Sequence, residues 1–182
     1  MGQLQFTDGL VVRSAQEDVA LYTPTYGLFE LRARAVADPA NMVALWMIGY
    51  GDMPERSGEI LVFEIFGRDV TTTTARIGMG VRPWADPRLR DTFEQVELAI
   101  DVREPHDYAV EWTPEAVAIY VDDRLVKVQA ESPDYPMQFM LNVYEFRDGA
   151  ALPSPPEAYP KAFRVDRFRA WRAAPSEVRR GR

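Results

Sequence analysis

Residues 116–128 read Ala-Val-Ala-Ile-Tyr-Val-Asp-Asp-Arg-Leu-Val-Lys-Val, and this stretch decides the fold class. Its two halves are rich in β-branched and aromatic residues, which favour strands over helices. The halves meet at Asp122 and Asp123, a pair of turn-forming residues with the length of a two-residue hairpin loop. The stretch therefore predicts two antiparallel strands joined by a tight turn.

Similar short, alternating runs recur along the rest of the chain, and turn residues separate them. Helical periodicity is scarce, and only Asp91 to Leu98 could form one or two helical turns. We predict one all-β domain at 1–175, most simply a sandwich of two antiparallel sheets, and a frayed tail at 176–182. The predicted strands are Leu10 to Ser14, Tyr26 to Val36, Met42 to Ile48, Glu59 to Phe66, Val70 to Ile77, Val96 to Val102, Tyr108 to Thr113, Val117 to Val121, Leu125 to Gln129, Met137 to Val143 and Phe163 to Trp171.

Composition and charge limit the class of protein. The chain has 182 residues, of which 21 are Lys or Arg and 28 are Asp or Glu, so its net charge is −7. Such a chain repels phosphate, and we expect no nucleic-acid partner. Apolar residues make up 47% of the sequence, which is enough for a core and excludes disorder as the main state. The absence of Cys and the single His, His106, exclude disulfides and multi-histidine metal sites.

The sequence shows no signal for a membrane or for export. It contains no run of about eighteen apolar residues, so we expect neither a membrane span nor a membrane partner. The first residues lack the basic and apolar regions of a signal peptide, so we expect a cytoplasmic protein unless an export signal was removed. We expect the protein to be a monomer.

The segment Ser57 to Gly67, with the sequence SGEILVFEIFG, places two carboxylates in an apolar strand. Strict alternation would put Glu59 and Glu64 on opposite faces, and a bare carboxylate in the core costs several kcal/mol. One β-bulge near Val62 or Phe63 would put both on the same face. Two carboxyl groups within ~5–5.5 Å suit a retaining glycosidase. An acidic pair on a solvated face, or a Glu paired with Arg, would produce the same pattern.

The segment Glu59 to Glu64 matches an E-x-D-x-x-E signature at both glutamates, and further segments agree with the same family pattern in one order along the chain. They are Tyr26-Gly-Leu-Phe-Glu-Leu-Arg32, Met42-Val-Ala-Leu-Trp-Met47, His106-Asp-Tyr-Ala-Val-Glu-Trp-Thr-Pro114, Phe139-Met-Leu-Asn142 and Val165-Asp-Arg-Phe-Arg169. Together they resemble glycoside hydrolase family sixteen, the laminarinase and lichenase family. The resemblance implies a concanavalin A-like jelly-roll with a concave glycan cleft, and a polysaccharide or oligosaccharide as the partner.

The resemblance also implies roles for individual residues. Glu59 would be the nucleophile that forms a glycosyl-enzyme intermediate, and Glu64 would act first as acid and then as base. No cofactor is required, although Asp166 marks a possible structural calcium site. The expected substrate-binding residues are Glu30, Arg32, Trp46, Phe66, Trp84, Asn142 and Tyr144.

Two departures from the family pattern keep the alternatives open. Leu61 stands at the middle position of the signature, where leucine can neither orient a nucleophile nor carry a proton. Glycines in the segment Thr74 to Gly80 stand where family members present polar or aromatic side chains to the glycan. The alternatives are a retaining glycosidase acting on a β-glucan-like polysaccharide, an inactive sandwich that only binds carbohydrate, and a structural sandwich whose cleft is filled by side chains.

Overall fold

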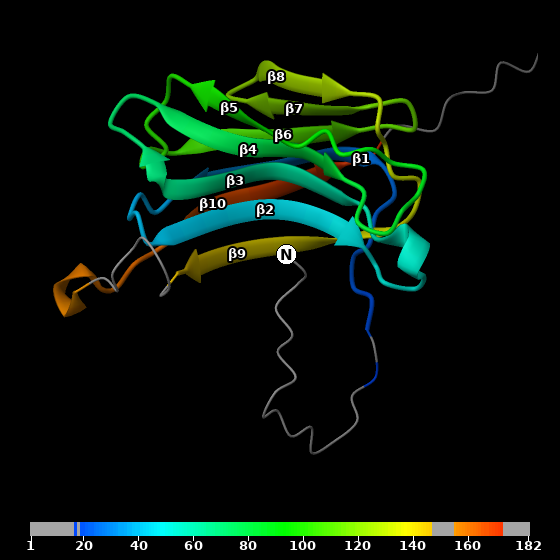
Figure 1. Ribbon diagram of the computed structural model, residues 1–182, viewed down its shortest axis with the longest axis horizontal. Helices are drawn as coiled ribbons and strands as arrows, with labels where there is room; N and C mark the ends of the chain where they lie inside the picture. Colours follow the sequence, from blue (N-terminus) through cyan, green and yellow to red (C-terminus); the bar gives the residue numbers. More distant parts are fainter. Residues whose placement is uncertain (1–16, 18, 147–154, 173–182) are drawn as a thin grey trace, which may run out of the picture.

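The computed structural model describes residues 17, 19–146 and 155–172, and it has two five-stranded antiparallel sheets (Figure 1). The β1 sheet has the order β10-β1-β6-β7-β8, and the β3 sheet has the order β5-β4-β3-β2-β9. The predicted two-sheet sandwich is confirmed. The strands are β1 (Gly27–Arg34), β2 (Asn41–Gly49), β3 (Glu59–Val70), β4 (Ala75–Arg82), β5 (Glu94–Leu98), β6 (His106–Trp112), β7 (Val117–Val121), β8 (Arg124–Gln129), β9 (Met137–Glu145) and β10 (Arg164–Trp171).

The only helical elements in the described part of the chain are two 3₁₀ turns, η1 (Pro54–Arg56) and η2 (Pro156–Ala158). No helix among these residues is long and apolar enough to cross a membrane. The predicted strand Leu10 to Ser14 and the predicted tail 176–182 lie outside the described residues.

The hairpin predicted from residues 116–128 is confirmed as β7 and β8. Asp122 and Asp123 have φ values of 48° and 62°. Positive φ at both central residues is the signature of a type I′ turn, whose twist matches that of the flanking strands. Asp tolerates this left-handed region better than most residues, because its short side chain can hydrogen-bond locally. The local sequence therefore determines the turn.

Alternation in the strands builds one core between the sheets. From β1 the buried side chains are those of Phe29, Leu31 and Ala33, while the residues between them face outward. The rings of Phe63 on β3 and Tyr108 on β6 lie 4.5 Å apart and join the two sheets across the core. Burial of aromatic and aliphatic side chains on both inner faces is what stabilises a sandwich.

The helical turns considered for Asp91 to Leu98 are absent, and this expectation is wrong. Glu94–Leu98 forms β5, which pairs with β4 along the edge of the β3 sheet. Val96 and Leu98, two residues apart, pair with Ile77 and Ala75, whose side chains are buried. Because a strand repeats every two residues, this pair reaches the core only in the extended form. Period-two burial therefore decides the structure of this segment.

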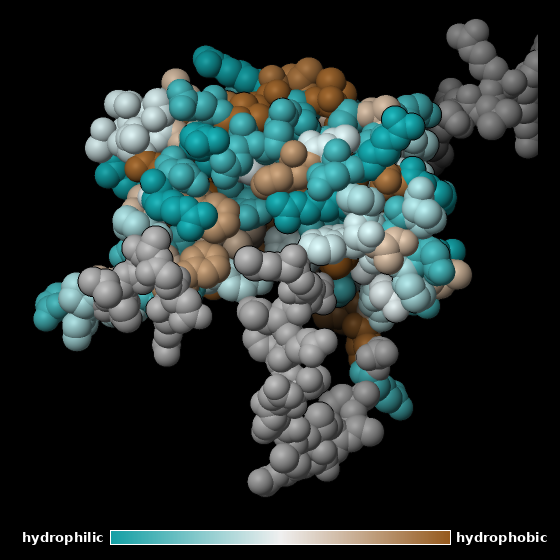
Figure 2. Space-filling view, in the orientation of Figure 1, coloured by the Kyte–Doolittle hydropathy of each residue, from teal (hydrophilic) through white to brown (hydrophobic). Residues whose placement is uncertain are grey.

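The β3 sheet lies in front of the β1 sheet in Figure 1. Figure 2 shows the surface from the same side, and most of it is hydrophilic. An apolar patch lies at the top of this view, over β8, where Leu125 and Val128 are exposed.

Candidate active site

The bulge expected in the acidic strand is present in β3. On the β2 side, Phe63 and Leu61 pair with two consecutive residues of β2. Val62, which lies between Leu61 and Phe63, therefore has no partner on β2 and is the extra residue of the bulge. On the β4 side, the register shifts between Leu61 and Glu64. Val62 and Phe63 are both 0% exposed, so two successive side chains enter the core. The bulge restores the alternation beyond it, and Glu59 and Glu64 therefore lie on the same outer face of the β3 sheet.

The same outer face collects most of the predicted binding residues. Cross-strand partners point to one face of a sheet. One row of partners runs across β3, β2 and β9 from Glu64 to Asn142, and the next row runs from Phe66 to Tyr144. The structure therefore brings together Glu59, Glu64, Trp46, Phe66, Asn142 and Tyr144.

Trp46 lies between the acidic strand and the edge of the sheet. It pairs with Leu61 on one side, and its indole Nε1–H donates to Oδ1 of Asn142 at 2.6 Å. This hydrogen bond sets the orientation of the indole on the outer face. Asn142 therefore orients an aromatic side chain of the site in addition to lining it.

A row of aromatic rings continues past Glu64. The ring of Phe146 stacks on Phe66 at 5.9 Å and on Tyr144 at 6.5 Å. The guanidinium of Arg68 lies over Phe66 at 4.3 Å from the ring centre. Phe146 was missed in the sequence, although its spacing of two from Tyr144, just past the end of β9, is the signal that could have found it.

Glu59 is only 6% exposed and has a polar environment of its own. Burial raises the pKa of the Glu59 carboxyl, and the negative charge of the nearby Glu64 raises it further. A hydrogen bond from the Trp84 side chain and the positive charge of Arg82 oppose this rise in pKa. Trp84 itself is 46% exposed and has a φ of 46°. The predicted binding residue Trp84 therefore reaches the acidic pair from a loop, and its indole favours the ionised form of Glu59.

Glu64 has a different balance of neighbours. Burial raises the pKa of the Glu64 carboxyl, while the charges of Arg82 and Arg68 oppose the rise. Nη2 of Arg82 lies 4.0 Å from Oε2 of Glu64. The pKa of both glutamates is thus raised by burial, and positive charge beside each of them opposes the rise. The site therefore combines two buried carboxyls with cations that favour their ionised forms.

The raised pKa of Glu64 predicts a pH-dependent effect of Glu64→Gln on stability. A carboxyl whose folded pKa exceeds its ordinary value of 4.5 stabilises the fold below pH 4.5 and loses that contribution as the pH rises through the folded pKa. Gln stays neutral throughout. We therefore expect the urea midpoint of Glu64→Gln, relative to the wild type, to increase from pH 4 to pH 8. A difference that is constant or shrinks with pH would contradict this expectation.

Gly78 and Gly80 make room for a neighbouring segment. A Cβ atom at Gly78 would lie 2.6 Å from Cζ of Phe93, and one at Gly80, where φ is 139°, would lie 2.6 Å from the carbonyl oxygen of Thr92. The Phe93 ring also lies 3.9 Å from the guanidinium of Arg82. The glycines on β4 therefore allow the segment before β5 to close over one side of the acidic pair and to hold Arg82 in place.

This packing predicts coupling between Gly78 and Phe93. Gly78→Ala should destabilise the wild type by about 1–3 kcal/mol, because the added methyl group overlaps the ring. In a Phe93→Ala background the same change should cost about 0.5 kcal/mol or less. Urea unfolding of the wild type, the two single variants and the double variant measures the difference between these two costs. Equal costs in both backgrounds would show that the ring does not occupy the space above Gly78.

A pocket of about 430 Å³ lies beside η1 and is lined from the outer face of the sheet by Ile48, Gln138 and Met140. Ile48 is the β2 partner of Glu59. The pocket therefore lies on the same outer face as Glu59, although neither Glu59 nor Glu64 is among its lining residues.

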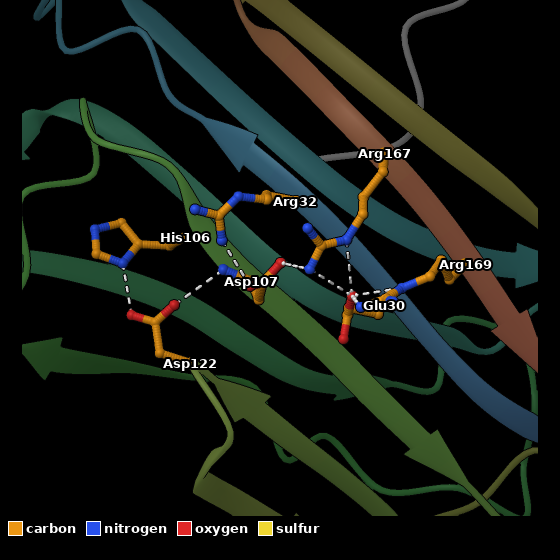
Figure 3. Close-up of polar contacts among 7 residues, drawn as sticks. All are labelled: Glu30, Arg32, His106, Asp107, Asp122, Arg167 and Arg169. Atoms are coloured by element: carbon orange, nitrogen blue, oxygen red, sulfur yellow. Dashed lines mark hydrogen bonds and ion pairs between the residues drawn. The ribbon is translucent and has the colours of Figure 1, made fainter.

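Glu30 and Arg32 do not belong to this site, which corrects the expectation that they bind the same glycan. Both lie on β1, in the other sheet, and face outward (Figure 3). Glu30 Oε1 accepts from Arg169 at 2.6 Å and from Arg167 at 3.2 Å. Asp107 joins Arg32 at 2.7 Å and Arg167 at 2.8 Å. This network ties β10 to β1 and β6, a role that the motif alone did not reveal.

Asp166 gives no support to a calcium site. Its Oδ1 lies 3.8 Å from Nη2 of Arg34, so a cation is already beside it. Within the described ranges, no group of three or more His, Cys, Asp or Glu side chains is arranged to hold a metal ion. Calcium needs six to eight oxygen ligands, so a structural calcium ion at Asp166 stays a prediction.

A family model and several known proteins match this chain. Residues 21–148 match the family model described as glycosyl hydrolases family 16. The chain is 29% identical over 131 residues to endo-1,3-1,4-beta-glycanase EglC of Rhizobium meliloti. The aligned segment covers 67% of this chain and 25% of that protein. It is 30% identical over 172 residues to a beta-glucanase of Rhodothermus marinus, covering 81% of this chain and 58% of that protein. It thus spans about a quarter of the first relative and somewhat over half of the second.

Two solved structures show the same fold. An endo-β-galactosidase from Clostridium perfringens superposes with a TM-score of 0.70 and 29% identity, over 92% of this chain and 43% of that chain. The laminarinase catalytic domain from Thermotoga petrophila superposes with a TM-score of 0.66 and 22% identity, over 83% of this chain and 65% of that chain.

Proposed function

Because the chain belongs to glycosyl hydrolases family 16, we propose that it is a retaining glycoside hydrolase acting on a β-glucan-like polysaccharide. The observation that carries this proposal is the bulge in β3, which puts Glu59 and Glu64 on one outer face of the β3 sheet. The names of the relatives, a beta-glucanase and an endo-1,3-1,4-beta-glycanase, support the substrate class.

The roles of the two carboxyls are those that the family resemblance implies. Glu59 attacks the anomeric carbon, while Glu64 donates its proton to the glycosidic oxygen, and the bond between that carbon and oxygen breaks. Glu64 then removes a proton from water, which attacks the same carbon and releases Glu59 with net retention of configuration. Burial raises the pKa of Glu64, which supports its protonated form, and Arg82 and the Trp84 side chain oppose the same effect of burial at Glu59.

Aromatic side chains on the outer face supply the binding surface. Trp46, oriented by Asn142, and the stacked rings of Phe66 and Tyr144 with Phe146 present flat apolar surfaces on either side of Glu64. Sugar rings have apolar faces and polar edges, so such surfaces combined with carboxylates suit a glycan.

The test is reducing-sugar release from a panel of mixed-linkage glucan, laminarin, xyloglucan, agar and carrageenan between pH 4 and pH 8. We expect release from at least one β-glucan, and nuclear magnetic resonance of the first product should show the anomer that the substrate had. No release from any polymer at any pH, or release of the inverted anomer, would refute the proposal.

A binding-only sandwich is the second candidate, and Leu61 is the observation that favours it. Leu61 lies on the outer face between the two glutamates and is 4% exposed. If the missing carboxylate is the defect, Leu61→Asp should raise polysaccharide hydrolysis from a low or absent level by about tenfold or more, because general acid–base positioning contributes about 10²–10⁴. The matched control is Leu61→Asn, which adds a polar group of the same size without the charge. Substantial hydrolysis by the wild type with no gain in Leu61→Asp would exclude this candidate.

A further inference from the structure

A second pocket lies on the β1 sheet, where β1 begins and β6 and β10 end. Its volume is about 450 Å³, within the usual range for small-ligand sites. None of the residues that line it belongs to the β3 sheet, so it is separate from the candidate active site. The side chains that matter for its chemistry are those of Tyr26, Leu28, Glu111, Trp171 and Arg172.

Trp171 presents an oriented but open ring to this pocket. The side chain is 44% exposed, although it ends the last strand of the sandwich. The guanidinium of Arg169 lies 5.3 Å from the Trp171 ring centre. Arg169 is itself held by Glu30, at 2.6 Å and 3.1 Å (Figure 3). The ion pair therefore fixes one neighbour of the ring and leaves much of the ring open to solvent.

The backbone that forms the wall of the pocket is strained. Tyr26 has a φ of 67°, in the left-handed region that a bulky residue rarely adopts. The next residue, Gly27, has a φ of 145°, and a Cβ atom there would lie 2.7 Å from the carbonyl oxygen of Trp171. The Tyr26 ring packs edge-on against Trp112 at 5.1 Å. Strain of this kind persists where the surroundings enforce it and often marks a ligand site.

The rim of the pocket carries groups of both charges. Glu111 accepts a hydrogen bond from the Tyr120 hydroxyl at 3.1 Å, and Arg172 also lines the pocket. A carboxylate accepts and a guanidinium donates hydrogen bonds, so together they suit the hydroxyl groups of an uncharged ligand. Glu111 is the only carboxylate among the described lining residues, whereas retaining hydrolysis needs two.

We propose that this pocket binds a neutral pyranose unit of a polysaccharide without cleaving it. One face of the sugar stacks on Trp171 with Leu28 beside it, and the hydroxyl groups reach Glu111 and Arg172. The pocket would hold the enzyme on a long polymer while the face with Glu59 and Glu64 acts on another part of it. This role does not depend on the hydrolytic activity.

Affinity electrophoresis tests the second site in native gels that contain laminarin, mixed-linkage glucan or xyloglucan. Glu59→Gln protein is used so that the polymer stays intact. We expect the polymer to retard this protein, and Trp171→Ala on the same background to weaken the apparent affinity at least about fivefold. Glu111→Gln replaces an exposed side chain of the same pocket and should also weaken retardation. This variant tests the pocket if Trp171→Ala proves less stable in thermal unfolding.

The matched control is Leu125→Ala, which removes an exposed apolar side chain from the same sheet outside the pocket. Its retardation should equal that of the parent. The inference is overturned if the parent is not retarded in any gel, if both pocket variants are retarded as strongly as the parent, or if Trp46→Ala alone abolishes retardation. Hydrolysis by the wild type without Trp171-dependent binding overturns only this inference. Trp171-dependent binding without hydrolysis overturns only the proposed function.

Discussion

Glu59→Gln is expected to reduce polysaccharide hydrolysis by about 10³-fold or more, because the loss of a covalent nucleophile removes the glycosyl-enzyme pathway itself. The amide can neither carry the negative charge that attacks the anomeric carbon nor act as a leaving group in the second step. The buried position and the indole donor of Trp84 remain, so binding should persist. Initial rates of reducing-sugar release at matched enzyme concentration measure the effect.

Glu97→Gln is the matched control for this substitution. Glu97 is an exposed glutamate on β5 of the same sheet, outside the acidic pair, and its replacement should leave the rate within a factor of two. If Glu59→Gln retains more than a tenth of the wild-type rate while Glu97→Gln is unaffected, Glu59 is not the nucleophile. Added azide tests the assignment further, because azide that replaces Glu59 as nucleophile gives a glycosyl azide of inverted configuration.

Glu64→Gln is expected to slow polysaccharide hydrolysis by about 10²–10⁴-fold, the usual contribution of general acid–base catalysis. The loss should depend on the leaving group. An oligosaccharide attached to a nitrophenol needs little help from an acid, so formation of its glycosyl-enzyme should be nearly as fast as in the wild type. Stopped-flow detection of nitrophenol should show a burst followed by slow turnover, because no base activates the water.

Azide should speed the slow turnover of Glu64→Gln, because it attacks the intermediate without losing a proton. The product should be a glycosyl azide that retains the configuration of the substrate, the opposite of the product expected with Glu59→Gln. An equal loss on the polysaccharide and on the nitrophenyl substrate would contradict the role of Glu64 as acid. The two variants therefore distinguish the roles of two chemically identical side chains.

The bulge in β3 could be predicted from the order of residues because its physical cause is local. Strict alternation would place either Glu59 or Glu64 in the core, and the free energy needed to bury that carboxylate exceeds the cost of one extra residue. The hairpin at Asp122 and Asp123 is local in the same sense, because its length and turn residues determine its twist.

The surroundings of the acidic pair could not be predicted from the order of residues. Trp84 and Phe93 come from the connection between β4 and β5, and the direction in which a loop folds depends on the surface that it packs against. From the sequence, the glycines on β4 indicated that side chains contacting the glycan are missing. In the structure, these glycines leave space for Phe93. Sequence spacing shows that a side chain is missing there but does not show what occupies the space.

The sheet to which Glu30 and Arg32 belong also could not be predicted from the sequence. Their motif correctly indicated the strand, but which of two stacked sheets contains a strand depends on long-range pairing. In the structure β1 pairs with β6 and β10, so these charges form ion pairs with Arg167, Arg169 and Asp107.

The amino-acid sequence by itself determined the all-β class and the shared face of the two glutamates, because alternation, turn chemistry and the burial of charge act over a few residues. Only the tertiary structure decided which aromatic and charged groups surround Glu59 and Glu64, and that a second pocket forms beside Trp171. Those contacts join segments far apart in the chain, and their formation depends on how the two sheets and their loops pack together.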